Sequence, residues 1–361
     1  MTLDTRSLLT TGFPRITVSG SPREMGLQHG TQARTQVRGS IEAYKSIFLD
    51  LAGLSWDKVL QAARQFDEPL RGKHADLVEE MEGVAEGAEV PYEEILALNC
   101  RSEISLAEPL DGCTSLSGLS ADGSRFVAQN WDWKTAIVPG IIILRLTPSP
   151  SSSSPSITLT TEAGIIGKMG HNSAGVVQCM NAIKARSLDR TKLPIHLLMR
   201  RVLQQGSAEE AREYVERVGG SAASVHLMVA DVTTAFTLET SPNGFEFIEP
   251  SGPNSTLAHT NHFLSPTLHK LSHEVPVWLP DSAGRLEIVR SRLSQAASGL
   301  SHEKIREVLS DRSLGECSIC RHEGGTGIDT LFTLTLNATN GSAEVKVGKP
   351  DEDGVVMDIA L

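Results

Sequence analysis

The residue whose type and position most clearly suggest chemistry is Cys113, within Asp111-Gly112-Cys113-Thr114-Ser115. Cysteine attacks acyl carbon atoms once a base has taken its proton. If the peptide bond before Cys113 breaks, the residue gains an α-amine, which titrates near about 7.7–8.0 and can act as that base. A single residue then supplies nucleophile and base. The plain alternative is a buried cysteine at the start of a strand.

Cleavage of the peptide bond before Cys113 can use the same Cys113 thiol. The thiol attacks the carbonyl carbon of Gly112, the acyl group moves from nitrogen to sulfur, and water hydrolyses the thioester. Gly112 favours this step because it has no Cβ to restrict a distorted backbone. We therefore predict self-cleavage between Gly112 and Cys113.

The elements before this point are predicted to be mostly helical. Ser21 can cap a helix, Pro22 suits its first turn, and Glu24 completes a capping box. We expect this helix to continue past Tyr44. Two further helices are predicted at residues 74–86 and 91–98.

The chain becomes rich in strands after Asp111. Residues 113–119 and 125–133 flank Ala121-Asp122-Gly123-Ser124, a strong hairpin signal. Ser207 and Glu210 predict a second capping box. Further strands are predicted at 141–146, 157–161, 176–183, 225–230, 235–239, 245–248, 331–336 and 343–347, and further helices at 193–205, 208–218, 282–297 and 303–309. Clusters of strands and clusters of helices indicate an α+β fold of layers.

Six stretches carry a resemblance to a known family. They read SPREMGLQHG, DGCTS, AQNWDW, TEAGIIGKMGHNSAG, AHTNH and SICR, and they extend from about residue 20 to 321. In order and spacing they resemble the acyl-coenzyme A:isopenicillin N acyltransferase family, the penicillin-biosynthetic branch of the cysteine N-terminal-nucleophile hydrolases. The resemblance implies a four-layer αββα sandwich. It also implies that residues 1–112 become a mostly helical chain that stays bound, while 113–361 form the catalytic chain.

The resemblance assigns roles around the cut. Cys113 matches the nucleophile, and Gly112 matches the residue left at the end of the released chain. Asp132 matches the acid that orients the new α-amine, although a carboxylate at a hairpin end can also cap backbone. Ser115 matches a small hydroxyl residue that assists cleavage.

Three more residues match groups that surround the reacting carbonyl. Asn261 matches the side chain of the oxyanion hole and Asn181 a second contributor, since hydrogen-bond donors aimed at the developing oxyanion accelerate acyl transfer. Either asparagine could instead cap a turn. Arg321 matches an arginine that favours the thiolate, and its alternative is a structural ion pair.

Two departures bear on the substrate. Related amide hydrolases carry an arginine three residues before the aspartate, whereas Gln129 stands here, as in the penicillin branch. The penicillin enzyme has a Ser-Arg-Gly run before the last hairpin, and residues 322–329 show no counterpart. This difference casts doubt on the penicillin substrate more than on the reaction type.

Composition excludes several classes of partner. The 361 residues carry a net charge of −11 with no dense run of Lys or Arg, so neither nucleic acid nor an anionic membrane is expected as a partner. No run approaches the roughly 18 apolar residues of a membrane span. The N-terminus lacks the pattern of a signal peptide, and the final Ile359-Ala360-Leu361 lacks the basic middle residue of a peroxisomal address. We expect a cytoplasmic protein, with the peroxisome less favoured.

Other signals are weaker. The five cysteines are few and odd in number, which predicts thiols rather than a disulfide framework. Cys317 and Cys320 form one C-x-x-C, but no second C-x-x-C or H-x-x-x-H completes a closed zinc site. Trp131 and Trp133 suit an acyl pocket or the core equally well. No metal or cofactor is expected.

Together these features predict a self-processing acyltransferase or amide hydrolase of secondary metabolism that acts through a Cys113 thioester. Its substrates would be small amides or acyl thioesters, with acyl-coenzyme A as a plausible donor. The alternative is an inactive relative that binds small molecules or protein partners.

Overall fold

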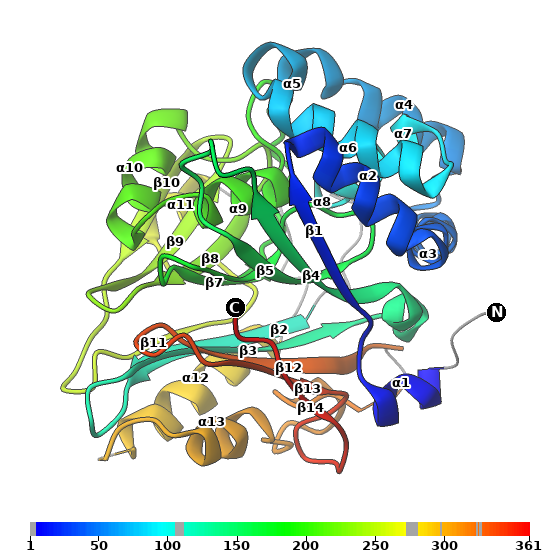
Figure 1. Cartoon of the computed structure of the whole chain (residues 1–361). Helices are drawn as coiled ribbons and strands as arrows, with labels where there is room; N and C mark the ends of the chain where they lie inside the picture. Colours follow the sequence, from blue (N-terminus) through cyan, green and yellow to red (C-terminus); the bar gives the residue numbers. More distant parts are fainter. Residues whose placement is uncertain (1–4, 105–111, 272–280, 297, 323, 325–326) are drawn as a thin grey trace.

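A computed structural model describes residues 5–104, 112–271, 281–296, 298–322, 324 and 327–361. Two β-sheets lie face to face, and helices cover the outer side of each (Figure 1). The predicted α+β class and the four-layer αββα sandwich are therefore confirmed.

The larger sheet has eight strands in the order β1-β4-β5-β6-β7-β8-β9-β10. Every pairing is antiparallel except that of β1 with β4, which is parallel. Its strands are β1 (Arg15–Gly20), β4 (Ile141–Pro148), β5 (Ile157–Glu162), β6 (Met169–Asn172), β7 (Val177–Ala182), β8 (Val225–Ala230), β9 (Ala235–Ser241) and β10 (Gly244–Ile248).

The smaller sheet has six strands in the order β11-β2-β3-β12-β13-β14. Its strands are β2 (Gly112–Leu119), β3 (Arg125–Trp133), β11 (Leu257–His259), β12 (Asp329–Asn337), β13 (Ala343–Val347) and β14 (Val356–Asp358). Successive side chains of a strand point to opposite faces of the sheet. Thus β2 and β3, which are buried along almost their whole length, present one face to the larger sheet and the other to the helices beneath.

The helices form two outer layers. Helices α2 to α10 cover the larger sheet, α1 lies beside the β14 end of the smaller sheet, and α12 and α13 lie under the smaller sheet (Figure 1). They are α1 (Thr5–Thr11), α2 (Pro22–Gln32), α3 (Arg34–Ala52), α4 (Trp56–Arg64), α5 (Asp67–Lys73), α6 (Ala75–Ala88), α7 (Tyr92–Asn99), α8 (Arg101–Ile104), α9 (Ile195–Leu203), α10 (Ala208–Val218), α11 (Pro266–Leu271), α12 (Asp281–Ser294) and α13 (His302–Leu309). Short 3-10 turns span Thr135–Gly140 and Gly315–Cys317.

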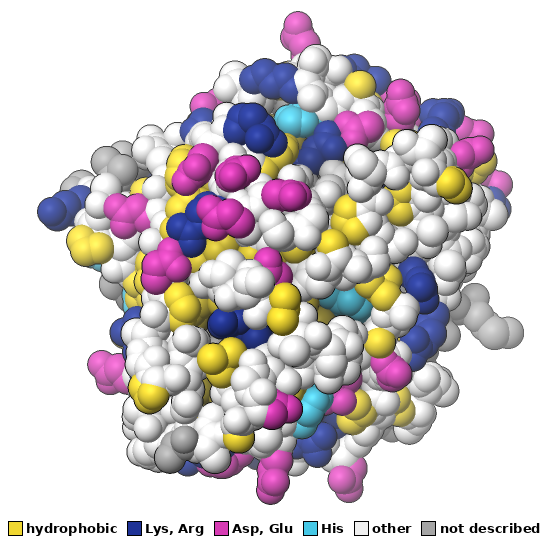
Figure 2. Space-filling model, turned by 60° about the vertical axis from the view of Figure 1, so that its left-hand side comes forward, with side chains coloured by type: hydrophobic (Ala, Val, Ile, Leu, Met, Phe, Trp, Pro, Cys, Tyr) yellow, Lys and Arg dark blue, Asp and Glu magenta, His cyan; other side chains and the backbone are white. Residues whose placement is uncertain are grey.

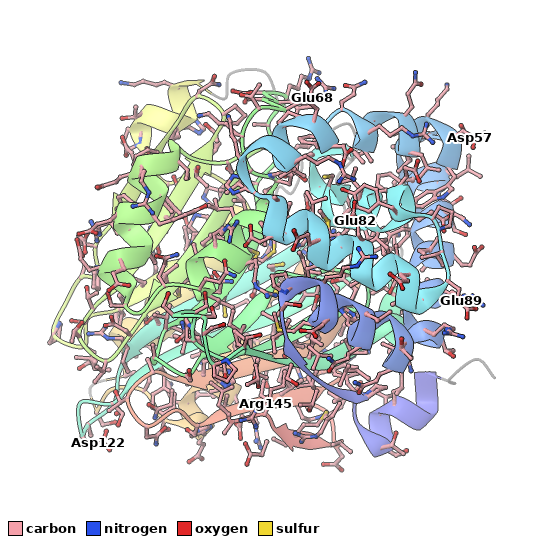
Figure 3. All side chains as sticks on the ribbon, turned by 45° about the horizontal axis from the view of Figure 1, so that its top comes forward. Asp57, Glu68, Glu82, Glu89, Asp122 and Arg145 are labelled. Atoms are coloured by element: carbon pink, nitrogen blue, oxygen red, sulfur yellow. The ribbon has the colours of Figure 1, made fainter. Side chains whose placement is uncertain are left out.

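The exposed surface of the N-terminal helices is strongly charged. Asp57, Glu68, Glu82 and Glu89 lie on the outer side of this layer in Figure 3. Glu82 and Glu89 pair with arginines, and Glu82 lies 2.8 Å from Arg71. Such exposed pairs contribute little to stability, so the layer is held mainly by its buried side.

The hydrophobic core lies where the sheets and helices meet. Apolar residues from α2 to α9 and from both sheets form one continuous buried cluster, and a smaller cluster lies between the outer face of β2–β3 and helices α12 and α13. The smaller cluster fixes α12 against the start of β2.

The structure departs from three sequence predictions. The helix expected to pass Tyr44 is two helices, because Ala33 leaves helical geometry (φ −106°, ψ 24°) between α2 and α3. The N-terminal third also contributes β1, a strand that was not predicted and that pairs in parallel with β4. At α10, Ser207 caps the backbone as predicted, but Glu210 accepts a hydrogen bond from Gly206, so the capping box is incomplete. The capping box at Ser21 is complete.

Buried polar contacts join the N-terminal segment to the rest of the chain. Arg200 forms a two-pronged ion pair with Glu80, at 2.8 and 3.1 Å, and both side chains are about 2 % exposed. Tyr44 donates a hydrogen bond of 2.7 Å to Glu162 at the end of β5. A buried polar group that loses its hydrogen-bond partner is costly in free energy. These contacts therefore fix the position of the N-terminal helices relative to the rest of the chain.

Candidate active site

Gly112 and Cys113 begin β2, in the middle of the smaller sheet. Gly112 lies opposite Asp132 and Cys113 opposite Trp131 on β3. The Cys113 side chain points between the two sheets with Ser115, and Cys113 is 1 % exposed. This arrangement places the predicted scissile bond at the point where the chain enters the sheet.

Asn261 lies beside Cys113, two residues after β11. Its Oδ1 accepts a hydrogen bond of 3.0 Å from the Cys113 backbone N–H and one of 2.9 Å from Nη2 of Arg285. A guanidinium has donors only, so the oxygen of the amide must face Arg285 and Cys113. The Nδ2 group therefore takes the other position of the amide, and it donates one hydrogen bond to the carbonyl of Ala182 at 3.0 Å.

Arg285, on α12, is a site residue that sequence reasoning missed. Its Nη1 donates to the carbonyl oxygen of Cys113 at 2.7 Å and to Thr114 Oγ1 at 3.0 Å. Its Nε donates to Asp281 at 2.7 Å. The i, i+4 spacing of Asp281 and Arg285 at the start of a predicted helix was a signal, but any exposed helix can carry such a pair. Full burial distinguishes this one.

Asp132 and Arg321 form a buried ion pair, with Nε of Arg321 3.3 Å from Asp132 Oδ2. Thr330 Oγ1 donates to Asp132 Oδ1 at 2.7 Å. Arg321 also pairs with Asp281, which therefore bridges the two arginines. Burial disfavours the charged form of Arg321, but the carboxylates of Asp132 and Asp281 outweigh it and raise its pKa. A permanent positive charge thus lies near the predicted scissile bond.

Gly112 packs directly on Arg321. A Cβ at position 112 would lie 2.7 Å from Nε of Arg321. A side chain there would push the guanidinium away from Asp132. Packing against the buried guanidinium therefore favours glycine at this position, as backbone freedom does.

Asn181, on β7, contacts Ser115 rather than the Cys113 backbone. Its Oδ1 accepts from Ser115 Oγ at 2.7 Å and lies 2.7 Å from Nδ1 of His226. Burial, and then His259, lowers the pKa of His226 well below its ordinary value, so His226 is neutral and donates through Nδ1. The buried Nδ2 of Asn181 has no hydrogen-bond partner among the described residues, which leaves a donor near the face that carries Cys113.

His226 belongs to a buried row of polar side chains. Its ring stacks on that of His259, with centroids 3.6 Å apart and planes at 4°. Nε2 of His259 lies 2.7 Å from Glu239. The histidine that follows Asn261, His262, bonds instead to Ser282. These histidines support the loop that carries Asn261.

Other residues singled out from the sequence are structural. Gln129 exchanges hydrogen bonds with the backbone of Met180 and so ties β3 to β7. Trp131 and Trp133 are buried in the main core, and the Lys168 ammonium lies 3.4 Å from the centroid of the Trp131 ring. None of the five cysteines, all of which are described, forms a disulfide.

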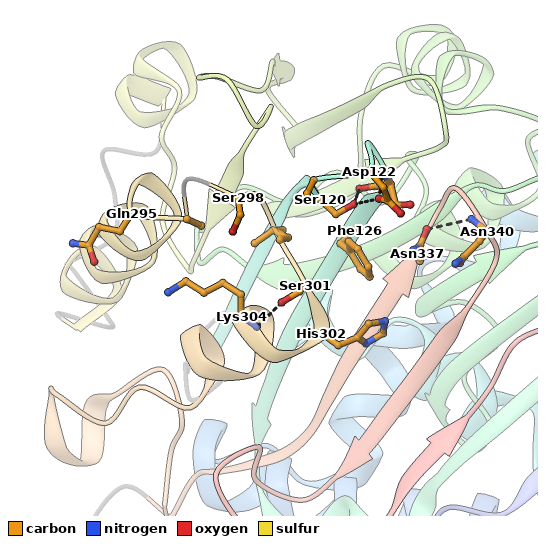
Figure 4. Close-up of a pocket in the computed structure, with 15 residues that line it drawn as sticks. Ser120, Asp122, Phe126, Gln295, Ser298, Ser301, His302, Lys304, Asn337 and Asn340 are labelled. Atoms are coloured by element: carbon orange, nitrogen blue, oxygen red, sulfur yellow. Dashed lines mark hydrogen bonds between the residues drawn. The ribbon is translucent and has the colours of Figure 1, made fainter.

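One pocket on the outer surface is separate from the candidate active site. The pocket in Figure 4 lies at the far end of the β2–β3 hairpin, and its labelled residues include Asp122, His302 and Lys304 but none of the candidate site residues. On the face shown in Figure 2, acidic and basic side chains are interspersed, without a broad basic area. No described helix is long and apolar enough to cross a membrane.

Comparison with known proteins identifies the family. Residues 119–352 match the family model "Acyl-coenzyme A:6-aminopenicillanic acid acyl-transferase". Over 345 residues, 93 % of both chains, the sequence is 32 % identical to the 40 kDa form of acyl-coenzyme A:6-aminopenicillanic-acid-acyltransferase from Emericella nidulans. The chain belongs to this acyltransferase family. The predicted membership and enzyme class are confirmed.

Two solved structures are similar over part of the chain. The conjugated bile acid hydrolase from Clostridium perfringens, a mutant form, has 13 % identity and a TM-score of 0.47, covering 69 % of this chain and 92 % of that one. Penicillin V acylase from Agrobacterium tumefaciens has 14 % identity and a TM-score of 0.43, covering 69 % and 86 %. The assignment to the acyltransferase family rests on the two sequence matches.

Proposed function

We propose that this member of the acyltransferase family is a self-processing enzyme that cuts itself between Gly112 and Cys113 and then transfers acyl groups through a Cys113 thioester. The observation that carries the proposal is the position of Cys113. Its backbone N–H is bound by Asn261, at 3.0 Å, and the residue before it packs against Arg321.

The cut proceeds by attack of the Cys113 sulfur on the Gly112 carbonyl carbon. A C–S bond forms, the C–N bond breaks, and the leaving nitrogen takes the thiol proton. Water then hydrolyses the thioester, which releases the Gly112 carboxylate and restores the thiol. The guanidinium of Arg321 lies beside Gly112, so it stabilises negative charge that develops there.

The new α-amine stays in the site of the former amide nitrogen. One of its N–H groups donates to Asn261 Oδ1, which leaves the nitrogen lone pair to take the thiol proton. Asp132, with its partners Thr330 and Arg321, supplies the negative charge that orients this amine. Ser115, two residues along the same face, assists the first cut.

Acyl transfer proceeds in two steps, in which the Cys113 thiol first takes the acyl group and then releases it. The thiolate attacks an acyl donor and expels an amine or a thiol, and water or an amine then takes the acyl group. One Nδ2 proton of Asn261 is bound by Ala182, and an amide nitrogen has two. The second proton, together with Nδ2 of Asn181, stabilises the oxyanion.

The substrates we propose are small acyl amides and acyl thioesters. The relative from Emericella nidulans is named for transfer from acyl-coenzyme A to 6-aminopenicillanic acid, so an acyl-coenzyme A donor is proposed here as well. Residues 322–329 differ from the penicillin enzyme, and residues 323, 325 and 326 of this loop lie outside those described. We therefore propose hydrolysis of simple donors ahead of penicillin formation.

Intact-protein mass spectrometry tests the proposal. Purified protein should give two chains, 1–112 and 113–361, and Cys113→Ala should give one chain. A single uncut chain with full activity would overturn the mechanism. A single uncut chain without activity would favour the alternative, a binding protein that performs no catalysis.

A further inference from the structure

Cys320, His322 and Asp351 meet at a place that the proposed reaction does not use. The distance from Cys320 Sγ to His322 Nε2 is 3.7 Å, and that from Sγ to Asp351 Oδ1 is 3.2 Å. His322 Nε2 lies 3.2 and 3.0 Å from the two oxygens of Asp351. One sulfur, one imidazole nitrogen and one carboxylate therefore form a compact triangle.

These distances match the edges of a zinc site. Bonds of about 2.3 Å to sulfur and about 2.0 Å to nitrogen and oxygen, in tetrahedral geometry, separate the ligand atoms by roughly 3.3–3.6 Å. The observed edges agree to within a few tenths of an ångström. Because these three ligand types suit zinc, which is intermediate in softness, we propose that Cys320, His322 and Asp351 bind one Zn²⁺ ion.

The surroundings of His322 support this proposal independently. A histidine that binds a metal through one nitrogen commonly offers the other to a carboxylate, which fixes the ring orientation. Nδ1 of His322 faces Glu352, at 3.4 Å from Oε1. The Nε2 atom is thereby directed at Cys320 and Asp351. Arg312, 3.6 Å from Asp351 and 57 % exposed, is free to move into solvent when a cation binds.

The site is open on one side. Cys320 is 1 % exposed, whereas the His322 and Asp351 side chains are 24 % and 18 % exposed. Water can therefore reach the fourth position of a tetrahedral ion. On binding, the Cys320 thiol releases its proton to solvent and its sulfur bonds to the metal.

The position of this site links it to Arg321. Backbone alternation sends Arg321 toward Asp132 while its two neighbours, Cys320 and His322, face Asp351. A bound ion would anchor the chain on both sides of Arg321. The consensus spacings of zinc motifs do not include this arrangement, because Asp351 comes from the turn after β13.

Metal titration of the full-length protein tests the site. Chelator-treated protein should bind one Zn²⁺ per molecule by calorimetry, whether or not it is cut, and Co²⁺ should give the near-ultraviolet absorption of a cobalt–thiolate bond. Cys320→Ser and Asp351→Asn should weaken zinc binding at least tenfold, and Cys320→Ser should abolish the cobalt–thiolate band. Circular dichroism would establish whether each variant is folded. If Cys320→Ser does not fold, Asp351→Asn still tests the site.

Two controls separate this site from other thiols. Cys317→Ser changes the other cysteine of the C-x-x-C, and Cys113→Ala removes the proposed nucleophile. Both variants should bind zinc as tightly as the wild type, whatever the outcome for self-cleavage. Absence of stoichiometric zinc binding, or unchanged binding in Cys320→Ser, would overturn the proposal.

Discussion

Nη2 of Arg285 lies 2.9 Å from Oδ1 of Asn261, and this contact determines which way the amide points. The same guanidinium binds the carbonyl of Cys113. Arg285 therefore holds both the backbone of Cys113, the proposed nucleophile, and the amide next to it. A planar group with several fixed donors suits this task better than the point charge of lysine.

Arg285→Gln should lower both self-cleavage and turnover by at least about tenfold, because loss of a buried charged partner costs several kcal/mol. Arg285→Lys should cleave faster than Arg285→Gln but slower than the wild type, because lysine keeps the positive charge but lacks the planar group with several donors. Gel-based processing rates and a pH–rate profile measure these effects. Arg292→Gln, at a partly exposed arginine on the same helix, is the control. Equal losses in Arg292→Gln would show only that α12 is destabilised.

Substitutions at Asn261 separate its two functions. Asn261→Ala should lower turnover by roughly 10²–10³-fold, the typical effect of removing an oxyanion donor. Asn261→Asp keeps an acceptor for the Cys113 nitrogen but loses the Nδ2 donor. It should therefore lose turnover to a similar degree, whereas wild-type turnover in folded Asn261→Asp would assign Asn261 to the amine alone.

Gly112→Ala should slow self-cleavage, because its Cβ would lie 2.7 Å from Nε of Arg321 and displace the guanidinium. The fraction of cut protein after a fixed time, read from a denaturing gel, measures the effect. Gly39→Ala is the matched control, since nothing lies within 4 Å of a Cβ at that helical position. Rapid, complete cleavage of Gly112→Ala would contradict the proposed packing requirement.

His29 should make stability depend on pH. It is buried and accepts a hydrogen bond from the Gly164 N–H at 3.2 Å. Burial, and then the charge of Arg200, lowers its pKa from 6.5 to about 4. In the unfolded chain His29 is protonated below about pH 6.5, whereas in the folded chain it stays neutral until about pH 4. The contribution of His29 to the free energy of unfolding is fully present above pH 6.5. It falls by on the order of 3 kcal/mol as the pH drops to 4.

Denaturant titrations between pH 4 and 7 measure this dependence. His29→Gln, which retains an acceptor, should show a shallower loss of stability on acidification. Some loss will remain, because burial also lowers the pKa of His171 and His262 to about 4. The exposed His302 provides a control, and an unchanged slope in His29→Gln would exclude His29 as a source.

The substrate prediction rests on the loop at residues 322–329. Contacts remote from the reacting bond help to stabilise the transition state, and this loop departs from the penicillin enzyme. Simple acyl amides and thioesters should be hydrolysed with higher kcat/KM than that for forming penicillin from 6-aminopenicillanic acid and a phenylacetyl thioester. Matched assays on processed protein test this. A higher kcat/KM for penicillin formation would show that the loop does not select the substrate.

Sequence patterns predicted the elements that local features determine. The hairpin that carries Cys113 and Asp132 followed from its turn residues, and the helix at Pro22 from its cap. The strand at 15–20 was missed, and its parallel partner lies 128 residues later in the chain, as the pairing of Thr17 with Arg145 illustrates. No local pattern reports such a partner.

The same limit applied to the site. Residues in recognisable motifs, such as Asn261 and Arg321, could be named in advance. Arg285 could not, because its importance comes from burial against Cys113 in three dimensions. The donor assignment of Asn261 also needed the structure, since only its neighbours determine the amide orientation.

Pairing of β1 with β4 has a consequence for handling the protein. In a cut molecule β1 would belong to one chain and β4 to the other, so unfolding would become a dissociation whose midpoint rises with protein concentration. Departure of the smaller chain would expose the edge of β4, whose residues 141–144 read Ile-Ile-Ile-Leu. Unprotected apolar edges of this kind pair with other chains. Separated chains should therefore aggregate instead of reassociating, and denaturation of the processed protein should be irreversible.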